Sequence, residues 1–347
     1  METNIASTQS EVDTNEAVRE AVNALQAGEI VALPTETVYG LAADALNVAS
    51  VEKIFEAKER PHFDPLIVHV HRKDALRDVA EVPEETGKTV TQLVETFWPG
   101  PLTLVLPKKP IIPEVVTGWL PTVAVRQCDH PVFHRIIRNF SGPLAAPSAN
   151  LFGQMSPTSA MAVMDQLDGR IPLIVDGGAC SRGLESTIVK VEPGDGAKPV
   201  ITILRPGPIT EIDLKKFGKV VFAERNADVE DSAPEAPGML ENHYAPNKPL
   251  HLLSSPEEFV PEEEKRYALL SYRGQPKDGF LDLYDWDFIS ILSPGSGRVA
   301  EAGTRFFHVL RELDSMEEID EIISEPMPDR GVGKAILDKL QKAAVKS

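Results

Sequence analysis

Cysteine and long apolar runs are scarce in this sequence of 347 residues. The two cysteines, Cys128 and Cys180, are too few for a disulfide framework and lack the spacing of a metal site. They suit small core residues of a reducing compartment. No apolar stretch approaches the roughly 20 residues of a membrane span, and the first dozen residues contain no apolar signal segment. We therefore expect a soluble, cytoplasmic protein.

Positive charge is also in short supply. The chain has 35 Lys and Arg against 53 Asp and Glu, a formal net charge of −18, and residues 1–210 hold 18 basic and 26 acidic side chains. A protein that grips nucleic acid mainly through its phosphates needs a basic excess. Strong autonomous nucleic-acid binding is therefore not expected. The motif G-x-x-x-x-G-K-[ST] is absent too, which excludes nucleotide binding of the P-loop type.

What the chain does have is enough apolar sequence, 42% of its residues, for two cores. Residues 1–212 alternate helical and strand patterns. The expected helices are 15–26, 51–57, 84–97, 131–139 and 159–167, and the expected strands are 29–33, 66–70, 102–106, 123–126, 144–146, 173–175, 186–191 and 200–204. Several of these strands are apolar on both faces, as in a sheet covered by helices. The sequence predicts an α/β (α+β) domain with a twisted mixed β-sheet.

The composition changes after residue 212. Residues 224–240 are acidic, punctuated by proline and without periodicity, which is typical of a linker. Further strands are expected at 250–253, 267–271, 289–292 and 319–324, and further helices at 298–313 and 332–344. We predict a catalytic domain at 1–212, a linker or lid at 213–247 and a small Rossmann-like α/β domain at 248–347.

Four cations stand where helices or strands end. Lys58 and Arg60 lie just before Pro61, which restricts the preceding residue and so ends the helix. Arg126 and Arg205 each end an apolar strand, where a charge must find a partner. Taken singly, each is also explained by a structural ion pair or a solvated helix end. Together they indicate a site for a polyanion, because Arg and Lys are the usual ligands of phosphate and carboxylate.

Polar side chains follow another apolar run, in the motif A-P-S-A-N at 146–150. Ser148 has no G-x-S-x-G elbow around it, so it suits a hydrogen-bond donor better than a nucleophile. Asn150 ends the same motif. Ser156 precedes Pro157 and has an alternative role as a cap for the helix expected near residue 159.

A further polar cluster comes from two other strands. Thr35 and Thr37 face one side of extended backbone while Glu36 faces the other. His69 and His71 lie two residues apart, but without a third clear ligand they are a weak zinc signal. We expect His69 to be an inward polar residue that orients a substrate.

Seven motifs follow one another along the chain: P-T-E-T-V-Y-G-L (34–41), K-E-R-P-H-F-D-P-L-I-V-H-V (58–70), F-W-P-G-P-L-T-L-V-L (97–106), V-A-V-R (123–126), A-P-S-A-N (146–150), E-S-T-I-V (185–189) and L-R-P-G-P-I-T (204–210). In this order and at these intervals they resemble the motifs of the YrdC/YwlC-like threonylcarbamoyl-adenylate synthases. The extension with P-G-M-x-x-x-H-Y-A-P (237–246) resembles the longer, two-domain members. The resemblance implies a YrdC-like catalytic domain and covers nearly the whole chain.

The implied reaction converts L-threonine, bicarbonate (or CO₂) and ATP into L-threonylcarbamoyl-AMP and pyrophosphate, the first step towards N6-threonylcarbamoyladenosine in tRNA. The amine of threonine forms a carbamate, which then attacks the α-phosphate. Because the reactants are anionic, catalysis should rest on positioning and charge neutralisation. Mg²⁺ is expected with ATP, bridging its phosphates without confident protein ligands. The implied partner is the downstream tRNA threonylcarbamoyl-transferase enzyme.

The resemblance also implies roles for individual residues. Lys58 and Arg60 would be the catalytic cations. L-Threonine would be held by Thr37, His69, Arg126 and Ser186, with Arg126 on its carboxylate. ATP would be held by Lys58, Arg60, Asp64, Thr122, Ala146, Ser148, Asn150, Ser156, Arg205 and Tyr244, with Tyr244 beside His243 as a lid. Asp64 stands where many members carry Asn, and its carboxylate suits a triphosphate site only if Mg²⁺ bridges them.

Three alternatives remain open from the sequence. The first is a tRNA- or double-stranded-RNA-binding module, because this type of domain resembles such binders. The second is a carbamoyl-transfer domain of the hydrogenase-maturation type, although the Cys clusters and acylphosphatase-like segment of those chains are absent. The third is a non-catalytic regulator, which would leave Lys58, Arg60 and Arg126 without a role. For the small domain we expect that it positions the linker or docks the next enzyme.

Overall fold

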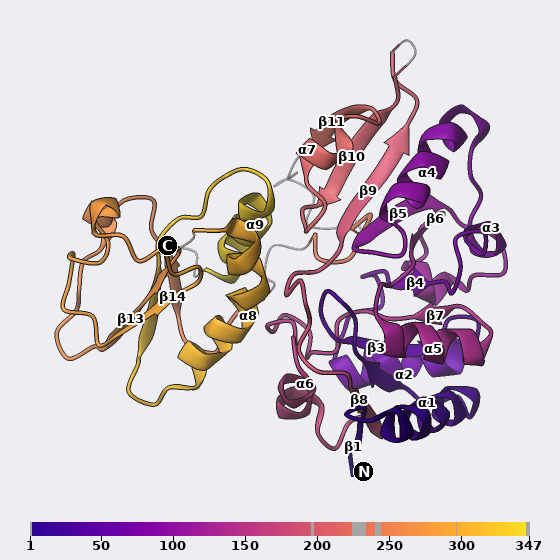
Figure 1. Cartoon of the computed structure of the whole chain (residues 1–347), viewed down its shortest axis with the longest axis horizontal. Coiled ribbons are helices and arrows are strands. Elements are labelled where there is room, and N and C mark those ends of the chain that lie inside the picture. Colours follow the sequence, from indigo (N-terminus) through magenta and orange to yellow (C-terminus); the bar gives the residue numbers. More distant parts are fainter. Residues whose placement is uncertain (1, 196–197, 224–233, 240–243, 296, 345–347) are drawn as a thin grey trace.

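The computed structural model describes residues 2–195, 198–223, 234–239, 244–295 and 297–344, which form two β-sheets with their helices (Figure 1). The larger sheet has the order β1-β8-β2-β3-β7-β4-β6-β5-β9-β10-β11. Its strands are β1 (Asn4–Ser7), β2 (Val31–Leu33), β3 (Gly40–Asp44), β4 (Ile67–His69), β5 (Leu102–Pro107), β6 (Thr122–Arg126), β7 (Leu144–Ala145), β8 (Leu173–Asp176), β9 (Thr187–Glu192), β10 (Val200–Arg205) and β11 (Lys219–Phe222). Parallel pairs such as β4/β6 alternate with antiparallel pairs such as β5/β6, so the predicted mixed sheet is confirmed.

Helices cover both faces of this sheet. They are α1 (Glu11–Gln26), α2 (Val48–Lys58), α3 (Leu76–Val79), α4 (Glu84–Phe97), α5 (Pro131–Phe140), α6 (Ala160–Leu167) and α7 (Glu211–Leu214), with a 3₁₀ turn at Glu114–Thr117. On one face, Leu25 of α1 and Phe133 of α5 share a core with Val175 of β8. On the other, Ile54 of α2 and Leu93 of α4 share a core with Leu104 of β5. Burial on both faces explains why the strands read as continuous apolar runs.

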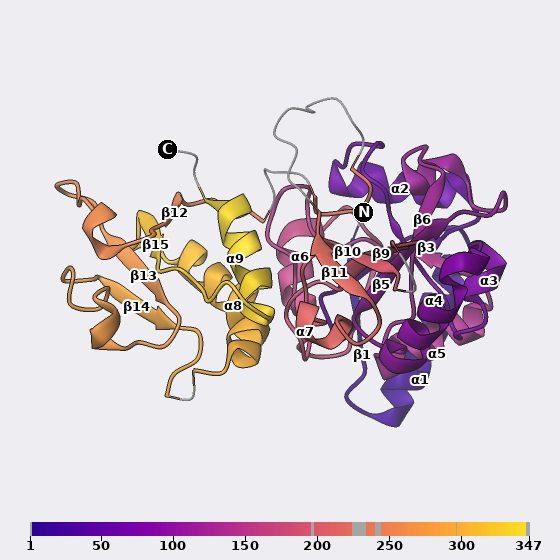
Figure 2. The ribbon, with the colours of Figure 1, turned by 90° about the horizontal axis from the view of Figure 1, so that it is seen from above.

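The smaller sheet has the order β12-β15-β13-β14, and all its pairs are parallel. Its elements are β12 (Leu250–Leu252), β13 (Tyr267–Ser271), β14 (Phe288–Ile291), β15 (Glu321–Ser324), α8 (Val299–Ser315) and α9 (Val332–Ala343), with 3₁₀ turns at Pro256–Glu258 and Pro276–Asp278. This arrangement confirms the Rossmann-like expectation. Helices α8 and α9 lie between the small sheet and the larger unit (Figure 2). None of the helices described is long and apolar enough to cross a membrane.

Three strands were not among the expected ones. β3 is a fully paired strand between β2 and β7, but its sequence G-L-A-A-D has none of the β-branched or aromatic residues that mark strands. β1 pairs with β8, about 170 residues away in sequence. β11 lies within the predicted linker and pairs parallel to β10.

The cap of α6 is Ser159 rather than Ser156, so the capping alternative for Ser156 is wrong.

Candidate active site

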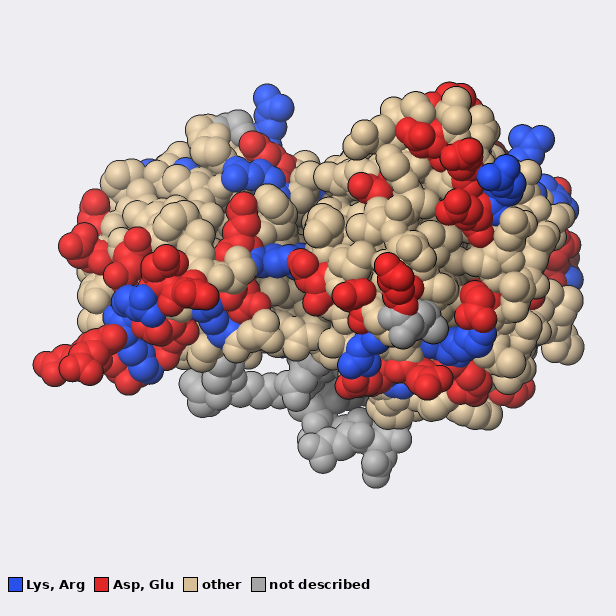
Figure 3. Space-filling view, turned by 90° about the horizontal axis from the view of Figure 1, so that it is seen from below, with Lys and Arg blue, Asp and Glu red and all other residues tan. Residues whose placement is uncertain are grey.

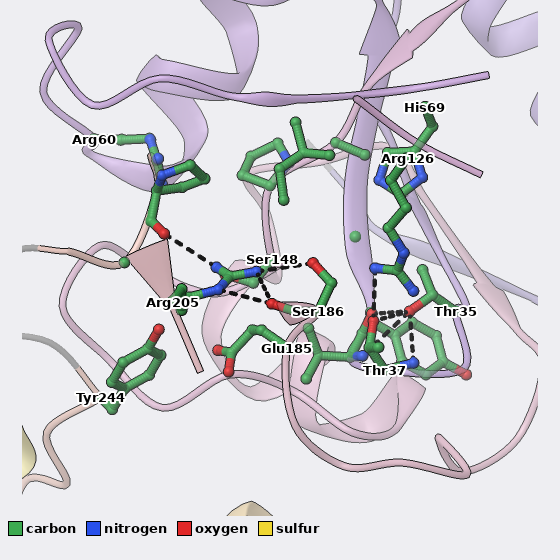
Figure 4. Close-up of a pocket in the computed structure, with 18 residues that line it drawn as sticks. Thr35, Thr37, Arg60, His69, Arg126, Ser148, Glu185, Ser186, Arg205 and Tyr244 are labelled. Atoms are coloured by element: carbon green, nitrogen blue, oxygen red, sulfur yellow. Dashed lines mark hydrogen bonds between the residues drawn. The ribbon is translucent and has the colours of Figure 1, made fainter. Parts of the chain in front are cut away.

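A pocket forms where several strands of the large sheet end and the linker passes over them (Figure 4). Nine of the predicted site residues line it: Thr37, Arg60, His69, Arg126, Ala146, Ser148, Ser186, Arg205 and Tyr244. They come from the loop after β2, the ends of α2, β4, β6, β7 and β10, the start of β9 and the linker. Side chains fill most of the pocket and leave a cavity of about 40 Å³.

Arg126 is fixed at one end of the pocket by three contacts. Its Nη1 donates to Thr37 Oγ1 (3.0 Å) and its Nε donates to the carbonyl of Gly100 (3.1 Å), while its Nη2 forms a buried ion pair with Glu36. Thr37 Oγ1 in turn lies 2.8 Å from Thr35 Oγ1, so both hydroxyls sit on the pocket side as expected. The guanidinium group therefore has one orientation, with the polar Thr35–Thr37 pair beside it.

Glu36 is a member of this cluster that the sequence did not identify. Its Oε2 accepts hydrogen bonds from Cys128 Sγ (3.0 Å) and from the backbone amide of Asp129 (3.1 Å). Burial raises the pKa of Glu36, but Arg126 and these hydrogen bonds outweigh it, and the net shift is downward. Glu36 is thus an anion that holds Arg126 in place. Cys128 is buried, and burial raises the pKa of its thiol, in keeping with a core residue.

His69 lies beside Arg126 in the same pocket. It is 2% exposed, and its ring centroid lies 4.9 Å from that of Phe133. Burial and the nearby Arg126 lower the pKa of His69 to about 3, so the ring is neutral at neutral pH. Its Nδ1 has no hydrogen-bond partner in the described part of the chain, which leaves it free to bond a substrate. His69 is suited to a neutral hydrogen-bonding role.

The two cations at the C-terminal end of α2 are both tightly held. Arg60 pairs with Asp64 (Nη2 to Oδ2, 2.8 Å) and donates to the carbonyls of Asp64 and Pro65. Lys58 donates from Nζ to the carbonyls of Ser148 (2.6 Å) and Asn150 (2.5 Å). Arg60 lines the pocket, whereas Lys58 lies behind it and fixes the backbone of the Ser148–Asn150 turn.

Five predicted residues do not line the pocket in this conformation: Lys58, Asp64, Thr122, Asn150 and Ser156. Asp64 is occupied by Arg60. Thr122 begins β6, four residues or about 13 Å before Arg126, at the opposite end of the strand. Asn150 donates to the carbonyls of Leu151 and Gln154 and so shapes its own loop.

Arg205 and the linker form the other end of the pocket. Arg205 donates from Nε and Nη2 to the carbonyl of Ser186 (3.1 and 3.0 Å), from Nη2 to Ser186 Oγ (3.0 Å), and from Nη1 to the carbonyl of Pro237 (3.2 Å). A Cβ on Gly207 would lie 2.6 Å from the backbone of this wall, which explains why a glycine follows Arg205 and Pro206. Arg205 therefore ties the sheet to the linker.

Glu185 also lines the pocket, between Ser186 and Tyr244 (Figure 4). It is a second residue that sequence reasoning missed, although it opens the motif E-S-T-I-V. Its Oε1 accepts a hydrogen bond from Ser156 Oγ (2.5 Å), so Ser156 reaches the site through Glu185. Tyr244, 1% exposed, completes the wall, whereas His243 lies outside the described residues. Within the described residues, no group of three or more His, Cys, Asp or Glu side chains is placed to hold a metal ion.

Comparisons with known proteins agree with this geometry. Residues 23–207 match a family described as telomere recombination (Sua5, YciO and YrdC), and residues 209–345 match the threonylcarbamoyl-AMP synthase C-terminal domain. The threonylcarbamoyl-AMP synthase of Bacillus subtilis is 39% identical, over 96% of this chain and 95% of the relative. Its counterparts from Pyrococcus abyssi and Schizosaccharomyces pombe are 38% and 34% identical, covering 94% and 96% of this chain and 94% and 89% of the relatives.

The structural comparison leads to the same relatives. The crystal structure of Pyrococcus abyssi Sua5 complexed with L-threonine matches with a TM-score of 0.82 at 35% sequence identity, and the match covers 99% of this chain and 98% of the other. The overall fold is therefore shared over nearly the full length of both chains. The chain belongs to the two-domain Sua5 family of threonylcarbamoyl-AMP synthases.

Proposed function

We propose that this protein makes L-threonylcarbamoyl-AMP and pyrophosphate from L-threonine, bicarbonate and ATP, as the first step towards N6-threonylcarbamoyladenosine in tRNA. The observation that carries the proposal is the convergence of Arg60, Arg126 and Arg205, from three distant segments, on one pocket. Three guanidinium groups suit a site where a carboxylate, a carbamate and a triphosphate meet. The relatives named threonylcarbamoyl-AMP synthase support the same activity.

Threonine would occupy the Arg126 end of the pocket. Arg126 binds its carboxylate, and Thr37, Ser186 and neutral His69 bond its remaining polar groups. A guanidinium already oriented by Glu36 loses little freedom when it binds a carboxylate. The amine nitrogen of threonine then bonds to the carbon of CO₂ and gives up a proton; if bicarbonate is the donor, water leaves.

ATP would occupy the Arg60 and Arg205 end. A carbamate oxygen attacks the α-phosphorus, the bond to the β-phosphate breaks and pyrophosphate departs. Arg60 neutralises phosphate charge. Burial lowers the pKa of Lys58 well below its ordinary value, so Lys58 acts mainly by fixing the turn that carries Ser148. A divalent metal, which we propose to be Mg²⁺, would add charge neutralisation on the phosphates. Because Asp64 is paired with Arg60, the phosphates rather than the protein would hold the metal.

The lid role of Tyr244 belongs to this proposal. A cavity of about 40 Å³ is far below the roughly 300 Å³ or more of a ligand site, so the nucleotide needs room. Pro237, Gly238 and Tyr244 line the pocket from the linker, and their outward movement would provide it. Ala146, Ser148 and Arg205 would then contact the nucleotide.

The chain would divide as the sequence suggests, with the chemistry in residues 1–212, the lid in 213–247 and a supporting unit in 248–347. We place the reaction in the cytoplasm, where ATP and tRNA are available. The product is a reactive mixed anhydride, which suits transfer to a downstream tRNA threonylcarbamoyl-transferase.

The test is pyrophosphate release from ATP, with threonine and bicarbonate omitted in turn. Wild type should require both. Arg60→Met combined with Asp64→Asn removes the buried pair without leaving a lone charge, and it should abolish the release while the protein stays folded by circular dichroism. Arg72→Met, at an exposed arginine, is the control and should stay active. Release from the double variant at the wild-type rate would reject phosphate binding by Arg60.

A further inference from the structure

The small unit sends one buried cation to the pocket of the large unit. Lys339 of α9 is 0% exposed, and its Nζ lies 3.1 Å from Glu185 Oε2. The same ammonium group lies over the ring of Tyr244, 4.9 Å from its centroid. A lysine is almost never fully buried unless it is paired. Lys339 therefore contacts two pocket-lining residues at once, although it lies more than 90 residues from either in sequence.

The charge of Glu185 gives this contact a function. Burial raises the pKa of Glu185, but Lys339 and Arg205 outweigh it and lower the pKa to about 2, so the carboxylate is anionic at neutral pH. Glu185 is 4% exposed and lines the end of the pocket that Arg205 occupies. An uncompensated carboxylate there would repel a triphosphate, and low solvent access would make the repulsion strong.

Two further contacts hold the same wall against the small unit. Lys342, one turn further along α9, donates to the carbonyl of Gly238 (2.7 Å), which lines the pocket. Thr304 Oγ1 of α8 donates to the carbonyl of Ser181 (3.1 Å), four residues before Glu185. Helices α8 and α9 thus hold both the segment that carries Glu185 and the linker segment opposite Arg205.

We propose that Lys339 is a positioning residue for the nucleotide: it neutralises Glu185 and fixes Tyr244, so the small unit completes the ATP site. The inference rests on the proposed function, because it assumes that a polyanionic nucleotide enters this pocket. This role of the Lys339–Glu185 pair can be told apart from a purely structural one. Loss of Lys339 should weaken ATP binding, because Lys339 neutralises the pocket wall. Loss of Glu185 should not weaken it, because Glu185 gives that wall its negative charge.

The experiment compares ATP dissociation constants of the full chain by calorimetry, without threonine. Lys339→Met removes the ammonium group that neutralises Glu185 and should raise the ATP dissociation constant about tenfold or more. Glu185→Gln removes the anion and should leave the ATP dissociation constant unchanged or lower it. The double variant Lys339→Met/Glu185→Gln should return to within about threefold of wild type. Lys334→Met, at a partly exposed lysine of the same helix that pairs with Asp329, is the matched control.

Two results would overturn the inference. One is equal weakening of ATP binding by both single variants, which is what a merely structural pair would give. The other is wild-type or tighter ATP binding by Lys339→Met. If Lys339→Met fails to fold, the Glu185→Gln and double variants still decide, because both should bind ATP about as wild type does. The KM for threonine should change less than twofold in every variant.

Failure of the proposed function would look different. If wild type binds ATP but releases no pyrophosphate with threonine and bicarbonate, the reaction is wrong, and the pattern of ATP affinities still tests Lys339. If pyrophosphate release is as proposed and the affinities do not follow this pattern, only the role of Lys339 is wrong.

Discussion

At the scale of single residues, two ion pairs at the pocket join residues that lie far apart in sequence. Arg126 meets Glu36 and Lys339 meets Glu185, while Arg60 meets Asp64 only four residues away. Removing one member of such a pair leaves a buried charge without compensation, which is far more costly than removing both. Substitutions in this pocket should therefore be made in charge-balanced pairs.

The first prediction concerns the contribution of His69 to the pH dependence of stability. Its pKa of about 3 in the folded protein lies below its ordinary value of 6.5, so only the unfolded chain takes up the proton between these values. The stabilisation is complete above pH 6.5 and is lost as pH falls towards 3, at about 1.4 kcal/mol per pH unit. The free energy of unfolding should therefore fall less steeply in His69→Asn than in wild type over this range, measured by urea denaturation. Parallel curves for the two proteins would show that His69 is not held neutral.

The arginines of the pocket were predictable from sequence, whereas Glu36, Glu185 and Lys339 were not. Arg126 and Arg205 stood out because a charge at the end of an apolar strand is unusual. Glu36 and Glu185 carry no such mark, since they follow polar or loop residues. Their partners lie 90 and 154 residues away: the folded sheet brings Arg126 to Glu36, and the packing of α9 brings Lys339 to Glu185.

At the scale of elements, the strands found from sequence were those rich in Val, Ile and Leu, such as β5, β6 and β10. The helices were found from their apolar spacing, and α4 was predicted with its observed bounds, Glu84–Phe97. β3 escaped because alanine and glycine carry little strand preference. Its place in the sheet comes from its neighbours β2 and β7.

The second prediction tests how closely α8 packs on the pocket wall. A Cβ on Gly183 (φ +69°) would lie 2.3 Å from the carbonyl oxygen of Thr304. Gly183→Ala should therefore lower the free energy of unfolding by at least about 3 kcal/mol. Gly295→Ala is the matched control, with φ +75° and open space around the Cβ, and should cost about 1 kcal/mol. If urea denaturation gives the same loss of unfolding free energy for both variants, Thr304 moves aside at little cost and α8 does not pack tightly on this wall.

The third prediction concerns Tyr244, whose ring lies 5.7 Å from that of Phe307 and under Lys339. Tyr244→Ala removes the linker's aromatic wall and should weaken ATP binding about tenfold, with a smaller effect on threonine. Tyr244→Phe keeps the ring and should stay within about threefold of wild type. Calorimetry with each ligand measures both. Unchanged ATP affinity in Tyr244→Ala would reject the lid.

At the scale of the whole molecule, acidic side chains outnumber basic ones, and the face in Figure 3 shows the two kinds interspersed. No extended basic surface appears among the described residues on that face. Arg60, Arg126 and Arg205, the cations of the proposed active site, are buried in the pocket, where they cannot neutralise the backbone of a long nucleic acid.

The fourth prediction follows from that distribution of charge. Unmodified tRNA at 150 mM salt should bind with a dissociation constant weaker than about 10⁻⁵ M, because the protein offers few phosphate contacts. Fluorescence anisotropy at two salt concentrations measures it. Submicromolar binding with a steep salt dependence would contradict the prediction and favour the RNA-binding alternative.

The pairing of β1 with β8 has a consequence for how the chain acquires its structure. Asn4 aligns with Leu173, so the pair closes a loop of about 170 residues. Closing such a loop lowers the entropy of the chain before any stabilising contact forms, and folding becomes slower as the number of such long-range pairings rises. β1 can pair only once β8 is in place, whereas the helices, which depend on local contacts, can form earlier. Refolding should therefore finish with this edge of the sheet, and amides of β1 should gain exchange protection last.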